Sequence, residues 1–381
     1  MQKMSATGVA MVLVVCVAAA CGGPSEDALS VEDAIRQNSK TKDAGTTQTG
    51  SDAATTTADA STAPSPDAGT VTPPPADAGS GCGPVQLGAN ASLGGARLFP
   101  DDNPWNTDVS AEALDPNGAA ILSRIGLATT LHPDFGATYN GAPNGIPYVV
   151  VGPTQAPVPI AFTAYGDESD PGPYPVPAGA PIEGGPSANG DRHVLVVQCS
   201  STAASHLGGL FELFGAYPQA GGSWNAASGA KFDPSSNALR PAGWTSTDAA
   251  GLPVFAGLVR YDEVIVEREI RHALRFTVSQ SRRAYVAPAR HFASSLTDAN
   301  LPPMGMRVRL KKGYDVSTFP PSVQVILVAL QRYGMFLADN GSSGYVSGAP
   351  DDRWNDTDLR ALGRITFADL EVVTMGPLVT Q

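Results

Sequence analysis

The sequence predicts a mainly β protein, organised as an antiparallel β-sandwich or jelly roll with a few short helices. Residues 82–381 consist of short runs of β-branched and aromatic residues separated by many Gly and Pro residues, a pattern typical of strands joined by turns. Three segments have helical character, and strands do not alternate with helices. A parallel sheet is therefore not expected, and a segment of this length suits one β-rich globular domain.

Short β-rich runs between turn residues predict the strands: Tyr148–Val151, Val158–Tyr165, His193–Gln198, Leu210–Phe214, Leu258–Val266, Ile270–Val278, Met306–Leu310, Met335–Leu337 and Glu371–Val373. Helices are expected at Asn117–Ile125, Pro321–Tyr333 and Asp356–Leu362. The second helix is the clearest, because its apolar residues recur on one stripe and Gly334 follows as a left-handed cap.

The first 21 residues resemble the signal peptide of a bacterial lipoprotein. A cationic start at Lys3 is followed by an apolar run from Val9 to Ala20, which is too short to span a membrane, and then by Cys21. In a lipoprotein this cysteine is lipidated and becomes the mature N-terminus. Ala18 stands where Leu is usual, so cleavage without lipidation remains an alternative. The protein is expected in the cell envelope, anchored to the bilayer outside the cytoplasm.

Residues 22–81 are predicted to be a disordered tether. They lack Phe, Trp and Tyr, consist mostly of Ala, Thr, Ser, Asp, Gly and Pro, and hold nine acidic and three basic residues. Such a segment cannot bury enough apolar surface to offset its chain entropy. Its repeated Asp-Ala-Gly triplets resemble the tethers of myxobacterial lipoproteins.

The net charge bears on nucleic-acid binding, and the cysteine content bears on disulfide formation. The chain has a formal net charge of -12, so binding to nucleic acid is not expected. With Cys21 lipidated, Cys82 and Cys199 form an even pair in an oxidising compartment, which predicts a disulfide; two unpaired thiols are the alternative.

Strand alternation predicts a cationic sheet face. If the strands are neighbours, one face carries Arg260, Asp262, Arg271, Arg275, Arg307 and Arg309. Guanidinium groups bind carboxylates through paired hydrogen bonds, so this face could hold an anionic polysaccharide, with Arg275 and Arg307 as binding residues. The alternative is a solvated outer face with cross-strand ion pairs.

Two carboxylates and one histidine are the catalytic candidates. Glu212 shares a strand face with Leu210 and Phe214, and this apolar setting raises a carboxyl pKa toward the range of a general acid. Asp262 is expected to complete a glycosidase pair with Glu212. His272 beside Arg271 could instead abstract the C5 proton of a uronic acid, which is lyase chemistry, with Tyr261 or Tyr285 returning the proton. The alternative for Glu212 is a structural pairing with an Arg, and for His272 a core position.

No cofactor or metal is predicted. The chain has no nucleophile elbow, phosphate loop, dinucleotide glycine run or His-Glu-x-x-His motif. The five histidines show no ligand spacing within one element, and three of them adjoin an Arg. A three-His site assembled from separate strands, as in cupin-like barrels, stays open.

Several motifs resemble a family of secreted bacterial proteins that is uncharacterised and at times fused to carbohydrate-binding modules. They are Leu98-Phe99-Pro100-Asp101-Asp102-Asn103-Pro104-Trp105-Asn106, His132-Pro133-Asp134-Phe135-Gly136, Gly243-Trp244-Thr245-Ser246, Leu258-Val259-Arg260-Tyr261-Asp262-Glu263 and Pro302-Pro303-Met304-Gly305-Met306-Arg307. The resemblance covers about residues 97–373 and implies one domain in a carbohydrate-rich context, without assigned catalytic residues.

Two functions from different classes follow. The first is a glycoside hydrolase or polysaccharide lyase whose groove lies between the arginine face and the long loop 217–257, with Trp244 at its mouth. Ordered loops of this length are often functional. The second is a non-enzymatic surface lipoprotein that binds glycan or a protein partner. Release of reducing ends, with or without absorbance near 235 nm, separates the two classes.

Overall fold

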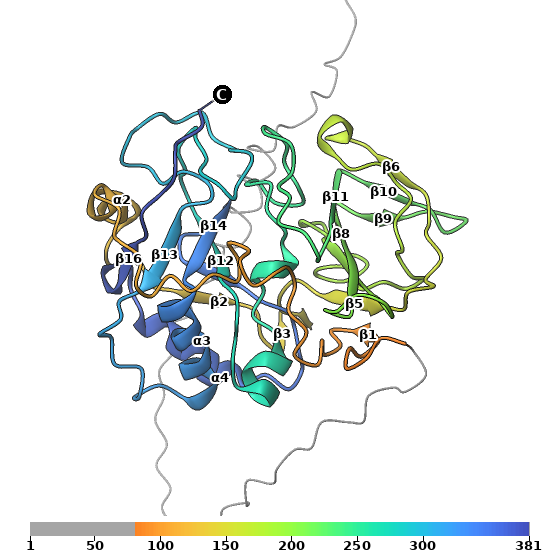
Figure 1. Ribbon diagram of the computed structural model, residues 1–381, viewed down its shortest axis with the longest axis horizontal. Helices are drawn as coiled ribbons and strands as arrows, with labels where there is room; N and C mark the ends of the chain where they lie inside the picture. The colour runs from red at the N-terminus through yellow and green to blue at the C-terminus, as the bar shows by residue number, and fades with distance from the viewer. Residues whose placement is uncertain (1–80, 381) are drawn as a thin grey trace, which may run out of the picture.

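The computed structural model describes residues 81–380 (Figure 1). The predicted signal peptide with Cys21, and the tether except Gly81, lie outside the described residues. Within residues 81–380, no helix has both the length and the apolar character needed to cross a membrane.

The first large sheet has five strands in the order β1-β5-β7-β8-β11. β5 pairs in parallel with β7, and the other neighbours are antiparallel. The sheet is buried on both faces, which explains why β5 and β7 are continuous apolar runs. The strands are β1 (Gly88–Ala89), β5 (Tyr148–Val151), β7 (Val194–Cys199), β8 (Leu207–Phe214) and β11 (Ser228–Phe232).

The second large sheet has six strands in the order β16-β13-β14-β12-β15-β2 and lies beside the first (Figure 1). β12 with β14, and β15 with β2, are parallel pairs. The strands are β2 (His132–Asp134), β12 (Leu274–Val278), β13 (Arg307–Leu310), β14 (Met335–Asn340), β15 (Tyr345–Ser347) and β16 (Leu370–Val372).

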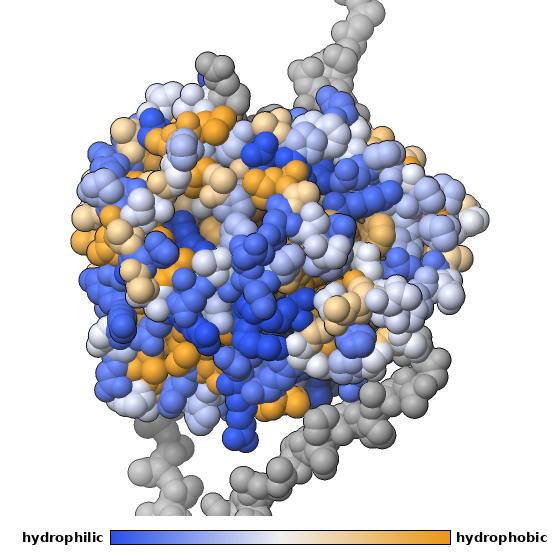
Figure 2. Space-filling view, in the orientation of Figure 1, coloured by the Kyte–Doolittle hydropathy of each residue, from blue (hydrophilic) through white to orange (hydrophobic). Residues whose placement is uncertain are grey.

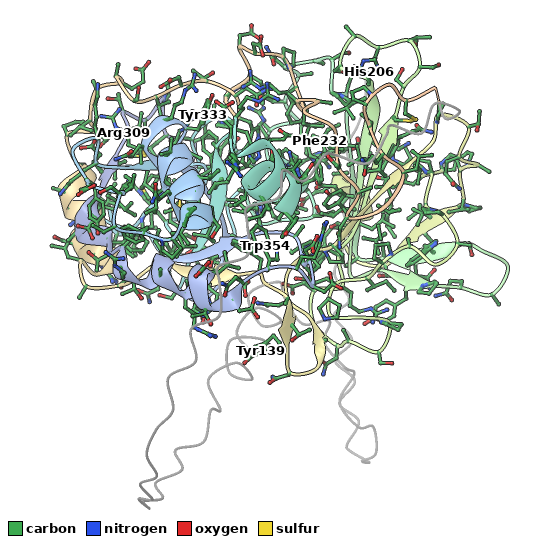
Figure 3. The ribbon with its side chains drawn as sticks, turned by 90° about the horizontal axis from the view of Figure 1, so that it is seen from below. Tyr139, His206, Phe232, Arg309, Tyr333 and Trp354 are labelled. Atoms are coloured by element: carbon green, nitrogen blue, oxygen red, sulfur yellow. A yellow bond between two sulfur atoms is a disulfide. The ribbon has the colours of Figure 1, made fainter. Side chains whose placement is uncertain are left out.

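Two small sheets complete the β structure. One, in the order β6-β10-β9, covers the outer face of the five-stranded sheet; the other is a hairpin that projects from the body and carries Tyr139 (Figure 3). Their strands are β6 (Ile160–Phe162), β9 (Tyr217–Pro218), β10 (Trp224–Ala226), β3 (Thr138–Tyr139) and β4 (Ala142–Pro143).

The helices are few and short. α2 (Gly118–Ile125) packs on β16, while α3 (Pro321–Arg332) and α4 (Asp356–Leu359) lie together beside the six-stranded sheet (Figure 1). Single 3-10 turns occur at Gly166–Glu168, Phe255–Gly257, Arg360–Arg364 and Phe367–Asp369. All three predicted helices are confirmed, and so is the cap on α3: Gly334 has φ +64°, where a Cβ would meet the Val308 carbonyl oxygen at 2.3 Å.

The mainly β prediction is confirmed, but the expectation of purely antiparallel pairing is wrong because both large sheets are mixed. The sandwich or jelly-roll topology is not confirmed. The predicted strand Leu258–Val266 is also wrong: after Arg260 the chain forms a π-helix at Asp262–Glu267. The predicted strand Ile270–Val278 begins only at Leu274.

One continuous apolar core joins the two large sheets. It contains Tyr148, Leu195 and Leu210 from the first sheet and Phe276 and Met335 from the second. The predicted disulfide between Cys82 and Cys199 is confirmed and ties the start of the body to the end of β7 at a Cα–Cα distance of 5.5 Å. The shared core therefore packs the two large sheets against each other.

Candidate functional site

A cavity of about 140 Å³ opens between the two large sheets, and we call it the central cavity. Figure 2 shows hydrophilic side chains in a band between the two parts of the molecule that hold these sheets. Strand ends and two loops supply polar groups of its wall, among them Asp134, Glu183, Asp191, His193, Thr245, Ser246, Thr247, Asp248, Arg275, Asp339 and Asn340. Most of its charged groups are carboxylates.

Asp248 is held firmly in the loop at 245–249. Its Oδ1 accepts hydrogen bonds from the backbone N–H groups of Ala250 and Leu252, both at 3.0 Å. Its Oδ2 faces Arg275 Nη2 at 3.4 Å. Burial raises the pKa of Asp248 to about 6, although Arg275 and the backbone donors act in the opposite direction.

Asp339, near the end of β14, is the neighbour of Asp248. The Ala249 N–H, one residue after Asp248, donates to Asp339 Oδ2 at 3.2 Å. Burial, together with the negative charge of Asp248, raises the pKa of Asp339 to about 6. Two adjacent carboxyls with raised pKa values, at the wall of a cavity, are a frequent feature of acid–base sites.

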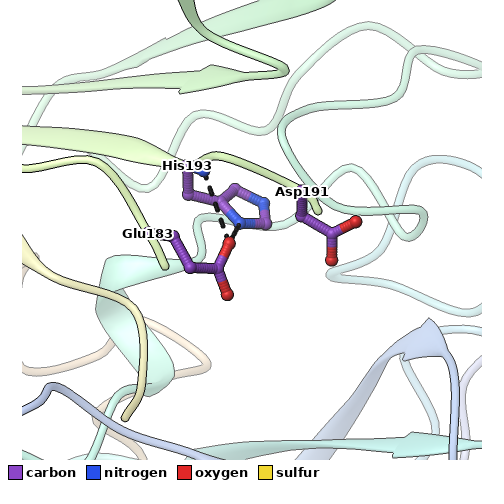
Figure 4. Close-up of side chains that lie close together, drawn as sticks. All are labelled: Glu183, Asp191 and His193. Carbon is purple, nitrogen blue, oxygen red and sulfur yellow. Dashed lines mark hydrogen bonds and ion pairs between the residues drawn. The ribbon is translucent and has the colours of Figure 1, made fainter. Parts of the chain in front are cut away.

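Three further groups converge on the wall formed by the first sheet. Ligand atoms of Glu183, Asp191 and His193 lie within 4.8 Å of one another, with both carboxylates close to the imidazole (Figure 4). His193 Nδ1 donates to Glu183 Oε2 at 2.7 Å, and Nε2 to the Thr247 carbonyl at 2.8 Å. Burial opposes the imidazolium charge, but Glu183 raises the pKa of His193 to about 9. Carboxylate and imidazole groups are common metal ligands, but a metal ion bound here would have to displace the proton on His193 Nδ1.

Two larger cavities adjoin the central cavity. The first, which we call the Phe292 arm, has a volume of about 400 Å³ and shares Tyr165, Thr245 and Ala249 with it. The second, the Tyr139 arm, has a volume of about 310 Å³ and shares Asp134 and Tyr345. Because each arm shares lining residues with the central cavity, the three cavities adjoin one another, and together we call them the groove.

Aromatic rings line both arms. In the Phe292 arm, His291 and Phe292 stack with centroids 5.9 Å apart. In the Tyr139 arm, His132 and Tyr345 stack at 4.3 Å, and Tyr139 is 58% exposed. Exposed ring faces beside polar groups suit ligands that are themselves partly apolar and partly polar.

Glu212 lies directly behind the wall of the central cavity. It is fully buried and accepts hydrogen bonds from Thr247 Oγ1 at 2.7 Å and from the N–H groups of Val254 and Phe255 at 3.0 and 2.8 Å. Burial raises its pKa, in the predicted direction. Because the donors come from residues on both sides of Asp248, these hydrogen bonds hold in place the loop that carries Asp248.

Asp262 and His272 lie together, but away from Glu212. Both line a separate cavity of only about 20 Å³, which is the size of a water molecule and not of a sugar ring. Asp262 accepts from Ser92 Oγ, and Glu263 bridges Arg260 and His272 at 2.5 and 3.2 Å. Asp262 lines this small cavity, whereas Glu212 lies behind Thr247 at the central cavity, so the expected acid pair is not assembled.

Of the predicted arginines, Arg275 and Arg307 share a sheet face, but most are buried and not exposed. Arg275 and Arg307 both pair with Phe336 of β14, so they share one sheet face as predicted. However, Arg307 is buried and donates to the carbonyls of Pro104, Thr107 and Tyr333. Arg260 and Arg309 are also buried and paired. The expected open cationic face is thus covered, and of the predicted arginines only Arg275 reaches the groove.

The two predicted aromatic binding residues lie outside the groove. Trp244 is half-buried with the Arg240 guanidinium 5.7 Å from its ring centre, although its neighbour Thr245 lines the groove. Tyr261 packs against Trp354 at 5.1 Å and beneath Arg353. The aromatic rings of the groove are instead those of the two arms and Phe214 of the central cavity.

Comparisons with family models, with curated proteins and with solved structures found no match to this chain.

Proposed function

We propose that this protein is a glycoside hydrolase that cleaves a polysaccharide within its chain. The observation that carries the proposal is the carboxyl pair Asp248 and Asp339 at the central cavity, which two further cavities lined by aromatic rings adjoin. A pair of carboxyl groups is the minimum for glycoside hydrolysis, and an open groove admits a chain that extends on both sides.

The environments of the two carboxyls favour different roles. Each carboxyl accepts hydrogen bonds from two backbone N–H groups. The difference is Arg275, which lies 3.4 Å from Asp248 and stabilises its ionised form, while the charge of Asp248 favours the protonated form of Asp339. Asp339 is then the general acid that protonates the glycosidic oxygen as the bond to the sugar carbon breaks. Asp248 is the base that takes a proton from the attacking water, or the nucleophile.

Hydrolysis is favoured over lyase chemistry at this groove. Lyase action needs a cation that neutralises the uronic carboxylate. Both cations of the central cavity, Arg275 and His193, already contact protein carboxylates. His272, the predicted base for elimination, lines the cavity of about 20 Å³ instead.

The proposal includes a place of action outside the cytoplasm, with the chain anchored through lipidated Cys21. The Cys82–Cys199 disulfide supports an oxidising compartment. The resemblance to secreted proteins that are fused to carbohydrate-binding modules supports the same setting.

The test incubates the purified protein with neutral, amino-sugar and uronic polysaccharides, then measures reducing ends and absorbance near 235 nm. New reducing ends without absorbance support hydrolysis, and a rise in absorbance would replace it with lyase action. Binding without either signal would establish the alternative, a surface lipoprotein that binds glycan. A panel without cleavage or binding would leave a protein partner as the ligand and reject the proposal.

A further inference from the structure

The segment 291–295 forms one wall of the Phe292 arm and is fixed to both sides of the acid site. Its His291 Nδ1 donates to the carbonyl of Ala249, the residue that follows the first carboxyl of the acid pair, at 2.8 Å. Asn340, which follows the second carboxyl, donates through Nδ2 to the Ala293 carbonyl at 2.7 Å. A sugar in this arm would therefore lie next to the acid pair.

Three polar groups of this arm are accessible and unpaired: the Arg283 guanidinium, His291 Nε2 and the Tyr165 hydroxyl. Within residues 81–380, none of them forms a hydrogen bond or an ion pair. Arg283 is exposed, and neither of the other two groups is among the buried atoms that lack a partner. Because His291 donates through Nδ1, its Nε2 accepts a hydrogen bond when the ring is neutral. The three groups can thus bind a ligand that enters the arm.

An aromatic surface lies beside the cation of this arm. The Arg283 guanidinium is 5.8 Å from the centre of the Phe292 ring. The planes of the Phe292 and His291 rings differ by only 10°. A pyranose has apolar C–H groups on its ring faces and polar groups at its edge. A sugar on Phe292 can therefore direct a substituent of its edge toward Arg283.

Arg283 differs from the cations of the central cavity. Arg275 and His193 already contact carboxylates of the protein, whereas Arg283 has no ion pair within residues 81–380. Glu168 lines the same arm, but its Oε2 accepts a backbone N–H at 2.9 Å. Arg283 can therefore bind an anionic group of a ligand, and a guanidinium binds a planar carboxylate through two parallel hydrogen bonds.

We propose that the Phe292 arm binds a uronic acid, so that the substrate is a polysaccharide that carries sugar carboxylates. The sugar ring lies on Phe292, and its carboxylate binds Arg283. Its hydroxyls bond to His291 Nε2 and to the Tyr165 hydroxyl. This inference rests on the proposed hydrolase function and names its substrate class. The anionic chain expected from the sequence is retained, but a different arginine binds it.

The test measures binding of four hexasaccharides to the full-length protein in detergent by calorimetry at about pH 7. Two are β-1,4 chains of glucuronate and of mannuronate. The other two are the matching chains of glucose and of mannose, which carry CH₂OH in place of each carboxylate. At low salt at least one uronate hexamer should bind about three- to tenfold more tightly than its neutral match, and about 0.5 M salt should shrink this preference.

Three variants locate the preference. Arg283→Gln should abolish most of it and leave binding of the neutral hexamers within about twofold. Arg283→Lys keeps the charge but not the paired hydrogen bonds, so it should retain part of the preference. Arg282→Gln is the matched control, because Arg282 is the neighbouring cation and does not line the groove. Circular dichroism of each variant checks that it is folded.

Uronate hexamers that bind no more tightly than their neutral matches in both pairs overturn the inference. So does a preference that Arg283→Gln leaves unchanged, or that Arg282→Gln reduces equally, because the general field of the surface would then be its cause. Cleavage of neutral chains as fast as uronate chains overturns only this inference. A rise in absorbance near 235 nm on the uronate hexamers rejects hydrolysis but keeps the uronate as ligand. The absence of cleavage on every polysaccharide rejects the hydrolase function, and the binding comparison then decides the uronate site alone.

Discussion

Arg275 Nη2 lies 3.4 Å from Asp248 Oδ2, and this contact joins the two large sheets at the central cavity. Arg275 comes from β12 in the six-stranded sheet, whereas the loop that carries Asp248 is tied through Thr247 to Glu212 in the five-stranded sheet. The same arginine donates to Ser347 Oγ at 3.0 Å. The acid site is thus built where two separate sheets meet, and it depends on both.

The first prediction is that Asp248 and Asp339 are both required for cleavage. Asp339→Asn removes the proposed proton donor and Asp248→Asn the proposed base or nucleophile, so each should lower kcat by about 10²–10⁴ with binding retained. Reducing-end assays and calorimetry on the best substrate measure the two effects. Asp101→Asn is the matched control, since it removes an exposed carboxylate outside the groove. Near-normal kcat in either cavity variant would reject the acid pair.

The second prediction concerns the pH dependence of stability. Asp248 and Asp339 have pKa values of about 6 in the folded protein, above the value of about 3.9 for an unfolded aspartate. Between these values the folded state holds protons that the unfolded chain has released. The free energy of unfolding should therefore fall as pH rises from about 4 to 6, by on the order of 2 kcal/mol per carboxyl.

Urea unfolding of the wild type, Asp339→Asn and Asp101→Asn at several pH values in this window measures the effect. Asp339→Asn should flatten the fall, and Asp101→Asn should not. If all three proteins lose stability in parallel, the raised pKa values do not belong to this pair.

The third prediction is a stabilising role for the disulfide. Cys82 and Cys199 are separated by 117 residues, so the bond restricts a long loop of the unfolded chain. Replacement of both cysteines by Ala should lower the free energy of unfolding by about 2–5 kcal/mol. Mass spectrometry without reduction should detect the linked peptide in the wild type. A double variant that melts like the wild type would show that the bond contributes nothing.

Local patterns predicted the elements well where burial is uniform. β5, buried throughout, was predicted with its correct bounds, and Gly334 was recognised because only a left-handed cap suits that position. The alternation of Arg260, Tyr261, Asp262 and Glu263 misled the strand prediction, because in a π-helix these charges pair within the turn. The order of strands, and hence the mixed pairing, depends on long-range contacts that no local pattern encodes.

The site was predicted only in part for a similar reason. Strand parity identifies Arg275. The segment 217–257, predicted as one long loop, in fact contains β9, β10 and β11, and its residues Thr245–Ala249 line the groove. Asp248 and Asp339 are 91 positions apart and come together only through the packing of two sheets. The polar run Asp339-Asn340-Gly341-Ser342 after a buried strand was the available signal for the second carboxyl. The alternation of side chains along a strand shows which residues share a sheet face, but not which segment covers that face. The burial of the other arginines could therefore not be predicted.

The fourth prediction is that Cys21 anchors the protein. Cys21→Ala removes the residue that the lipoprotein signal would modify, so the protein should move from the membrane pellet to the soluble or culture fraction. Immunoblots of the fractions measure this, with Cys16→Ala inside the apolar run as the control. A variant that still sediments with membranes would show that another feature holds it there.

The fifth prediction separates a positioning role from a catalytic role for Glu212. Its carboxylate accepts three hydrogen bonds, and Glu212→Gln would turn an amide NH₂ toward at least one of those donors. We expect the free energy of unfolding to fall by about 2–4 kcal/mol, because a buried donor loses its partner. Cleavage should fall by no more than about tenfold, and its pH profile should keep the limbs set by Asp248 and Asp339. Urea unfolding and rate measurements across pH provide both readouts.

The matched control for Glu212 is Glu263→Gln, which changes another buried carboxylate. Glu263 bridges Arg260 and His272 beside the small cavity and does not line the groove. Its loss should cost stability as well, but leave the rate of cleavage by the folded protein close to that of the wild type. If Glu212→Gln instead lowered kcat by about 10²–10⁴ with stability unchanged, Glu212 itself would be the proton donor predicted from the sequence. The loop at 245–249 would then have to move aside to admit substrate, because Thr247 separates Glu212 from the cavity.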